Sequence, residues 1–363
     1  MDMYNYFDRA RACYELLQDE LSRKIFRARL SCDFELSRQN LKELVRLSEQ
    51  QEWLEKLGER LTAGELERSG RKLILYGTNI TGQTVAELLM EKGIDFYGFC
   101  GRRAREIPEG IMGKPVIEPG FLFQHAEEFC VIVAVAEAVE EILGILEKNN
   151  FPREQILSSF RTDGETDHQY FEFPELFPRG KAFVDGGCLD CRSSYLFADW
   201  CGGDYSKIFA FEPDPISYSI CKRNIDEKPI RDFRLINAGL SDREGEVSFR
   251  AGLYGGSYVI QPGAEEEEKV TTVRVTTIDG TVGDEPVGFI KMDIEGSEFG
   301  ALHGAERTIR RDRPLLALSV YHLPGDMLAI MDYLHELVPK YRFWLRHYSV
   351  GNADTVLYAA ILR

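Results

Sequence analysis

The stretch that decides the fold of this 363-residue chain is FVDGGCLDCRSS, at residues 183–194. An apolar run ends in an acid, Asp185, and two glycines follow directly. After them the pattern predicts a helix from Tyr195 onward. This order of strand, turn and helix is typical of a ligand-binding turn at the carboxyl edge of a parallel sheet. Gly187 is the residue at which such a turn would let the backbone approach a ligand closely.

Two later strands also end in acids. The segment IFAFEP, residues 208–213, places Glu212 25 residues after the second glycine of that turn, about the separation expected for a ribose-binding carboxylate. In FIKMDIEGSE, residues 289–298, Asp293 and Glu295 are two positions apart on a strand end and so point the same way. We therefore expect these carboxylates to converge on one cleft, whereas the last acid of that segment is equally explained as a helix start.

The rest of the chain predicts two further parts. Up to about residue 66, apolar residues recur at helical spacing and proline is absent, which predicts a helical segment. Strand runs and helical patterns then alternate up to a polar linker around residue 161, which predicts a small parallel sheet. The expected fold is α/β, with two successive Rossmann-like units behind a helical N-terminal appendage. The predicted domains are residues 1–66, 67–163 and 164–363.

The first unit contains a weaker glycine loop, Gly77-x-Asn79-x-x-Gly82, between a predicted strand and a helix. Asn79 stands where a nucleotide fingerprint has its middle glycine, and no acid ends the next strand. Arg102 and Arg103 follow that strand instead, and they could hold a phosphate. A nucleotide site and a turn that binds nothing both remain open for this loop.

Composition limits the partners and the location. The chain has 44 basic and 60 acidic residues, for a net charge of −16, and a field of that sign repels nucleic acid. No apolar stretch is long enough to span a bilayer, and the first residues do not form a signal peptide. We expect a cytoplasmic protein without a membrane span, and the helical N-terminus makes a homodimer a possible assembly.

Eight cysteines are too few, in a chain of this length, for a disulfide framework. Cys188 and Cys191 form a single CxxC motif, which has a zinc or redox interpretation. Structural zinc usually takes a second pair of ligands, and neither Cys201 nor Cys221 belongs to a pair at that spacing. No metal site is predicted.

Six pieces, FVDGG, FAFEP, LSDREG, FIKMDIEGSE, YH and RHY, occur in this order over residues 183–348. In this combination the C-terminal domain resembles the FkbM family of S-adenosylmethionine-dependent methyltransferases. The resemblance implies a class I seven-stranded sheet and activity mostly on hydroxyls of sugars or polyketide-derived compounds. The family's cofactor loop usually has a glycine where this chain has Cys191.

The resemblance also implies roles for individual residues. The residues implied for S-adenosylmethionine binding are Asp185, Gly187, Asp190, Glu212, Ser241, Asp242 and Asp293. The residues implied for catalysis are His322, Asp293 and Glu295, and those for the acceptor are Tyr321, Arg346 and His347. Separately, residues 73–156 resemble small nucleotide-sugar-binding domains of acetyltransferases through LYGTNITG, YGFC and GKPVI.

A hydroxyl acceptor must lose a proton. His322 is the natural base because its ordinary pKa lies near operating pH, and Asp293 or Glu295 would serve if burial raised its pKa. A structural histidine is the rival interpretation of His322. The expected function is methyl transfer to a hydroxyl of a sugar or related small-molecule or carrier-linked acceptor. The alternatives are a non-catalytic nucleotide- or sugar-nucleotide-binding scaffold and, less favoured, a dehydrogenase.

Overall fold

The computed structural model describes residues 3–62, 64–135, 139–159, 168–250, 258–259 and 270–362. The polar linker predicted around residue 161 lies outside these residues. The chain forms two compact units. The first consists of Met1–Arg23, Asp167–Leu345 and Val356–Arg363, and the second of Lys24–Thr166 and Arg346–Thr355. The N-terminal helices are therefore divided between the units.

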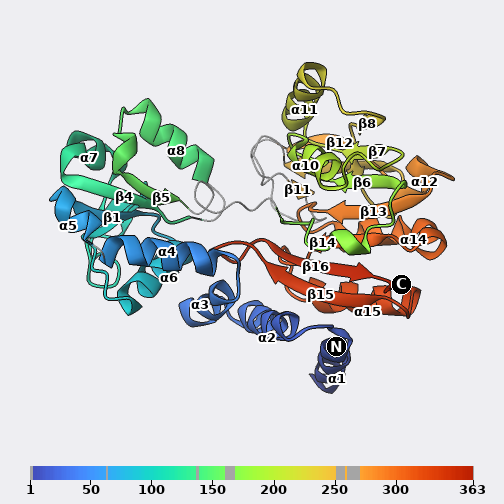
Figure 1. The fold of residues 1–363 in the computed structure, drawn as a ribbon, viewed down its shortest axis with the longest axis horizontal. Helices are drawn as coiled ribbons and strands as arrows, with labels where there is room; N and C mark the ends of the chain where they lie inside the picture. The colour runs from blue at the N-terminus through green and yellow to red at the C-terminus, as the bar shows by residue number, and fades with distance from the viewer. Residues whose placement is uncertain are drawn as a thin grey trace. The chain divides into compact units, whose positions relative to one another are not determined.

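A seven-stranded sheet forms the centre of the first unit (Figure 1). Its strands, from one edge to the other, are β15 (Arg342–His347), β16 (Thr355–Ala360), β14 (Leu315–Ser319), β13 (Val287–Met292), β6 (Ala182–Gly186), β7 (Ile208–Phe211) and β8 (Phe233–Ile236). The strands from β14 to β8 are parallel, and β16 is antiparallel to β14. The predicted α/β fold with a seven-stranded C-terminal sheet is confirmed.

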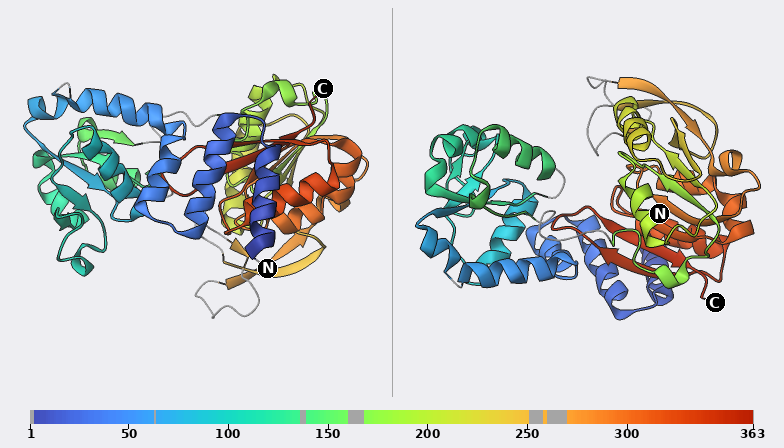
Figure 2. Two further views of the ribbon diagram at one scale, coloured as in Figure 1. Left: turned by 90° about the horizontal axis from the view of Figure 1, so that it is seen from below. Right: turned by 45° about the horizontal axis from the view of Figure 1, so that its top comes forward.

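Helices and a second, smaller sheet surround this centre. The helices are α1 (Met3–Leu16), α10 (Arg192–Trp200), α11 (Pro215–Glu227), α12 (Ile278–Val282), α13 (Glu298–His303), α14 (Glu306–Asp312) and α15 (Asp326–Leu337). The small sheet has the order β11 (Tyr258–Val259), β10 (Gly245–Arg250), β12 (Val270–Thr276) and β9 (Gly239–Leu240). Helix α1 packs on α15, where Arg9 pairs with Asp332, and the two helices lie side by side in Figure 2.

Aromatic side chains build the core between β6, β13 and α10. Phe183 and Phe197 stack with ring centroids 4.1 Å apart, and Phe289 lies 5.1 Å from Phe183. Phe171 and Trp200 close the cluster, with their rings 5.5 Å apart. Burying one such side chain contributes about 1.5–3 kcal/mol, so this cluster anchors the helix that follows the glycine turn.

The second unit contains a five-stranded parallel sheet, as the alternation of strands and helices predicts. Its strand order is β3 (Val116–Ile117), β2 (Gly98–Cys100), β1 (Lys72–Tyr76), β4 (Phe129–Val133) and β5 (Ile156–Ser159). Its helices are α3 (Arg38–Arg46), α4 (Gln50–Thr62), α5 (Glu65–Ser69), α6 (Ile80–Glu91), α7 (Pro119–Gln124) and α8 (Val139–Lys148), and α2 (Glu20–Phe34) contributes residues to both units. Short 3-10 helices cover Ala104–Glu106, Ala126–Glu128, Arg153–Gln155 and, in the first unit, Pro174–Leu176. Among the described helices, none has the length and apolar character required to cross a membrane.

Arg29 ties two distant segments of the second unit together. Its side chain is only 2% exposed, and its guanidinium donates to Asp33 at 2.7 Å and to the carbonyl of Asn352 at 2.7 Å. Asn352 belongs to the segment Arg346–Thr355, which joins this unit from the far end of the chain. A buried charge of this kind is stable only while its partners remain in place.

We predict that Arg29→Met lowers the free energy of unfolding by about 3–5 kcal/mol, because it removes the buried guanidinium that binds both the Asp33 carboxylate and the Asn352 carbonyl. Urea denaturation followed by circular dichroism measures the change. Arg27→Met is the control, since Arg27 lies on the same helix with an exposed side chain. Equal effects of the two substitutions would contradict the prediction.

Candidate functional site

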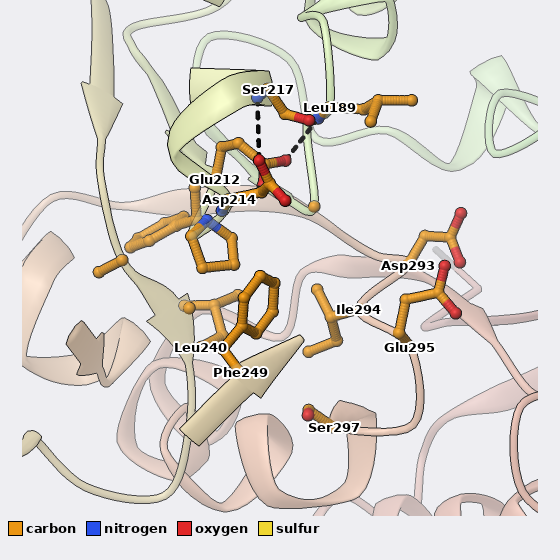
Figure 3. A pocket seen from close by; sticks show the side chains of 15 residues that line it. Leu189, Glu212, Asp214, Ser217, Leu240, Phe249, Asp293, Ile294, Glu295 and Ser297 are labelled. Atoms are coloured by element: carbon orange, nitrogen blue, oxygen red, sulfur yellow. Dashed lines mark hydrogen bonds between the residues drawn. The ribbon is translucent and has the colours of Figure 1, made fainter. Parts of the chain in front are cut away.

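A pocket opens at the carboxyl ends of β6, β7 and β13 in the first unit (Figure 3). Its empty volume, counted with its open mouth, is about 730 Å³. The lining residues are Gly187, Leu189, Phe211, Glu212, Pro213, Asp214, Ser217, Ala238, Gly239, Leu240, Phe249, Asp293, Ile294, Glu295 and Ser297. Acids lie at two sides of the pocket, and apolar side chains lie between them.

Gly187 brings two of the strand ends into direct contact. Its φ is +72°, in the left-handed region, and a Cβ atom placed on it would lie 2.0 Å from the carbonyl oxygen of Asp293. No other residue fits this backbone and this space. The turn after β6 and the acidic turn after β13 therefore form one continuous wall.

Glu212 joins the glycine turn to the start of α11. Its carboxylate accepts the backbone N–H of Leu189 at 2.9 Å and that of Asp214 at 2.8 Å. Burial raises the pKa of Glu212 to about 8, against the opposing effect of these two N–H groups. Asp214 in turn caps α11 by accepting the N–H groups of Ile216 and Ser217. One carboxylate thus holds both segments at this side of the pocket.

Asp293 lies opposite and is held by two tyrosines. Its carboxylate accepts the hydroxyl of Tyr170 at 2.8 Å and that of Tyr321 at 3.2 Å. Burial acts to raise the pKa of Asp293, but the positive charges of His322 and Lys291 outweigh it, so this pKa lies below its usual value. Asp293 is therefore ionised at neutral pH.

His322 sits among three carboxylates. Its Nδ1 lies 3.0 Å from Glu298, and its Nε2 lies 3.4 Å from Glu295 and 3.5 Å from Asp293. Burial acts to lower the pKa of His322, but these carboxylates raise it to about 9. At neutral pH His322 is an imidazolium and has no free nitrogen with which to accept a proton. Donor atoms of Asp293, Glu298 and His322 lie within 4.8 Å of one another, so a divalent cation could compete with the ring proton for this set.

Asp185 has a supporting position outside the pocket lining. It is fully buried, accepts the hydroxyls of Ser193 and Ser194 at 2.7 Å each, and lies 3.3 Å from Lys291 Nζ. Lys291 also donates to the carbonyls of the two glycines of the turn, at 3.0 and 2.7 Å. Burial acts against a charge on Lys291, but Asp185 and Asp293 hold its pKa above its usual value. This pair fixes the shape of the turn.

The structure brings some of the predicted site residues together and not others. The pocket is lined by four of them: Gly187, Glu212, Asp293 and Glu295. Tyr321 and His322 do not line it but contact Asp293. Among the residues predicted to bind the cofactor, those outside the lining, besides Asp185, are Asp190, Ser241 and Asp242. Asp190 accepts the N–H of Arg192, and the hydroxyl of Ser241 donates to Asp242.

Arg346 and His347 are the last two residues of β15, and they group with the second unit, whereas the preceding residues of this strand group with the unit that contains the pocket. His347 is 1% exposed, and its Nδ1 bonds the Thr355 hydroxyl at 2.9 Å. Burial and the nearby charge of Arg29 lower its pKa to about 3, so the ring is neutral. His347 thus packs the interior of the second unit.

Three residues at or behind the pocket were not among the predicted site residues. Tyr170 comes from the segment before the sheet, and no pattern in the sequence marks it. Glu298 is fully buried and accepts the N–H of Ile294 at 2.9 Å, although its position suggested only a helix start. Lys291 did carry a signal, since a charged residue inside an apolar strand needs a partner.

In the glycine loop of the second unit, a side chain of the loop itself occupies the position at which a phosphate would bind. The Asn79 side chain accepts the N–H of Gly82 at 3.1 Å, at the first turn of α6, where a phosphate would otherwise bind. A Cβ on Gly77 would lie 2.3 Å from the Ala134 carbonyl oxygen, so this glycine serves close packing. Arg102 and Arg103 pair with Glu141 and Glu106 on the surface.

We predict that Gly187→Ala destabilises the first unit by clearly more than Gly202→Ala. Gly202 has a similar φ of +63° but open space where a Cβ would lie, so its substitution costs only the backbone strain of about 1–2 kcal/mol. Gly187→Ala adds a collision with the Asp293 carbonyl. Thermal unfolding of the two variants measures the difference, and equal midpoints would show that β6 and β13 do not approach so closely.

We predict that His322→Gln changes the pH dependence of stability. The folded pKa of about 9 lies above the ordinary value of 6.5, so the stabilisation from His322 is complete below about pH 6.5 and is lost as the pH rises through 9. The difference in unfolding free energy between the parent protein and the variant should therefore shrink over this range. Urea denaturation at pH 6, 7.5 and 9.5 measures this difference. A difference that does not depend on pH would contradict the arrangement in which three carboxylates surround the His322 ring.

Comparison with known proteins assigns a family to part of the chain. The family described as "Methyltransferase FkbM domain" matches residues 190–343. Among curated proteins, none matches the chain.

Several solved structures resemble it at low identity. Methyltransferase FkbM from Methylobacillus flagellatus KT is 18% identical, covering 86% of this chain and 99% of that one, with a TM-score of 0.43. An rRNA methylase from Streptococcus thermophilus is 16% identical, covering 53% and 92%, with a TM-score of 0.35. An O-methyltransferase from Bacillus cereus, in complex with SAH, is 15% identical, covering 61% and 90%, with a TM-score of 0.33. These likenesses carry no assignment by themselves; the family finding is that residues 190–343 of this chain match the FkbM methyltransferase domain.

Proposed function

We propose that the first unit binds S-adenosylmethionine and transfers its methyl group to a hydroxyl of a sugar or a related small-molecule or carrier-linked acceptor. The observation that carries this proposal is the meeting of Gly187, Glu212 and Asp293 in one pocket within a methyltransferase domain.

The pocket has the chemistry that this cofactor requires. Each oxygen of Glu212 accepts one N–H, so in its ionised form the carboxylate still has lone pairs that can accept ribose hydroxyls. Leu240, Phe249 and Ile294 offer the apolar surfaces between which a purine would lie. The ionised Asp293 suits the positive charge of the methionine end. When bound, the cofactor would supply a methyl group on a sulfonium.

The residues around Asp293 suit the acceptor hydroxyl. With His322 protonated at neutral pH, the groups that can accept a proton from that hydroxyl are the carboxylates of Asp293 and Glu295. We infer that one of them orients the hydroxyl and takes up its proton, while His322 holds both in place from 3.5 and 3.4 Å. His322 itself would act as a base only above about pH 9.

Calorimetric titration with S-adenosylhomocysteine tests the cofactor site. We predict that the parent protein binds it and that Glu212→Gln weakens binding by about tenfold or more, because the amide places an N–H against one of the two backbone donors. Glu227→Gln, an exposed glutamate on α11, should leave affinity unchanged. If the parent protein binds neither this ligand nor S-adenosylmethionine, the alternative of a non-catalytic scaffold is favoured.

Methyl transfer itself is tested with S-adenosylmethionine labelled in its methyl group, against a panel of sugars and sugar nucleotides. We predict that Asp293→Asn lowers kcat by about a hundredfold, because the variant cannot accept a proton at this position. Cofactor affinity in the same variant shows whether the loss lies in binding or in chemistry. Unchanged turnover in a folded variant would rule out this role for Asp293.

A further inference from the structure

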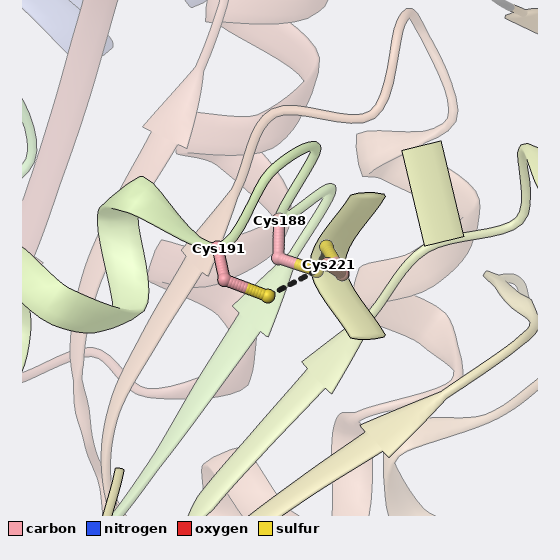
Figure 4. Close-up of side chains that lie close together, drawn as sticks. All are labelled: Cys188, Cys191 and Cys221. Carbon is pink, nitrogen blue, oxygen red and sulfur yellow. Dashed lines mark hydrogen bonds between the residues drawn. The ribbon is translucent and has the colours of Figure 1, made fainter. Parts of the chain in front are cut away.

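Three cysteine sulfurs meet beside the pocket wall (Figure 4). The Sγ atoms of Cys188 and Cys221 are 3.6 Å apart, those of Cys191 and Cys188 are 4.0 Å apart, and all three lie within 4.8 Å of one another. All three side chains are buried, with at most 2% exposed. Cys188 and Cys191 lie in the turn before α10, and Cys221 lies on α11, so the CxxC motif gains a third sulfur from a distant segment.

The backbone of the turn takes an unfavourable conformation to achieve this. Leu189 has a φ of +53° and Cys191 a φ of +69°, both in the left-handed region that favours glycine. A non-glycine residue there costs about 1–2 kcal/mol. Cys191 is the N-cap residue of α10, yet its side chain makes no capping hydrogen bond and lies with the other two sulfurs instead. A glycine would remove the strain, but it would also remove this sulfur.

We propose that Cys188, Cys191 and Cys221 form a binding site for one thiophilic d10 metal ion, such as Zn²⁺ or Cu⁺, with three sulfur ligands. Metal–sulfur bonds of about 2.3 Å place the sulfurs of a three- or four-coordinate ion about 3.8–4.0 Å apart, close to the separations found here. A disulfide would need only two of the three sulfurs. Soft thiolate ligands select ions of this class.

Charge and proton balance fit this site. The three ligands are thiols, and each loses its proton when its sulfur binds the metal. Binding thus forms three metal–sulfur bonds, releases the thiol protons and involves no oxidation.

The test uses the full-length protein, reduced and treated with a chelator, and titrates it with Cd²⁺ as a spectroscopic probe. We expect a thiolate-to-cadmium charge-transfer absorption that saturates at one equivalent, and displacement of Cd²⁺ by Zn²⁺ or Cu⁺ in separate titrations. Cys221→Ser should abolish this absorption. Cys201→Ser, a buried cysteine of the same unit outside the cluster, should retain it.

Cys191→Gly shows whether a lost absorption comes from a missing ligand or from a loss of fold. This substitution removes one sulfur ligand and also relieves the strained backbone. We expect this variant to be at least as stable as the parent protein in thermal unfolding and to lack the absorption. The proposal is overturned if the parent shows no saturable absorption, if Cys221→Ser or Cys191→Gly retains it, or if mass spectrometry finds a Cys188–Cys221 disulfide with no metal uptake after reduction. None of these results depends on S-adenosylmethionine binding.

Discussion

The buried ion pair between Lys291 and Asp185 is the interaction on which the site depends. Lys291 lies on β13 and Asp185 on β6, and the ammonium also binds the two glycine carbonyls of the turn. These contacts fix the turn against the neighbouring strand, where Gly187 touches the backbone of Asp293. The shape of the pocket wall therefore depends on the buried Lys291 ammonium, whose partners are all groups of the protein.

Much of this could be predicted from the sequence, because the relevant signals are local. An apolar run that ends in an acid and glycines defines β6 and its turn, and the same reasoning placed Glu212, Asp293 and Glu295 at strand ends that share one edge. The seven-stranded sheet followed from the family resemblance. The N-terminal residues were correctly predicted to be helical, but their division between two units depends on contacts with segments far along the chain.

The remaining features depend on distance in space and not on sequence pattern. Cys221 is 30 residues beyond Cys191 in the chain, and only the packing of α11 against the turn brings their sulfurs together. The charge of His322 is a similar case, since Glu298, Glu295 and Asp293 must all fold around the ring before its pKa rises. His347 shows the reverse: the same residue type, buried near Arg29, becomes neutral.

The division of the chain has a consequence for how the protein is made. The second unit contains Arg346–Thr355, including the carbonyl that Arg29 binds, so it lacks a structural segment until residues far beyond its own strands have left the ribosome. During vectorial synthesis all five strands of its sheet are made before that segment, so the packing around Arg29 is completed only after residues 168–345 have been translated. A nascent chain stopped after residue 166 would thus contain all five strands, but its Arg29 guanidinium would lack the Asn352 carbonyl.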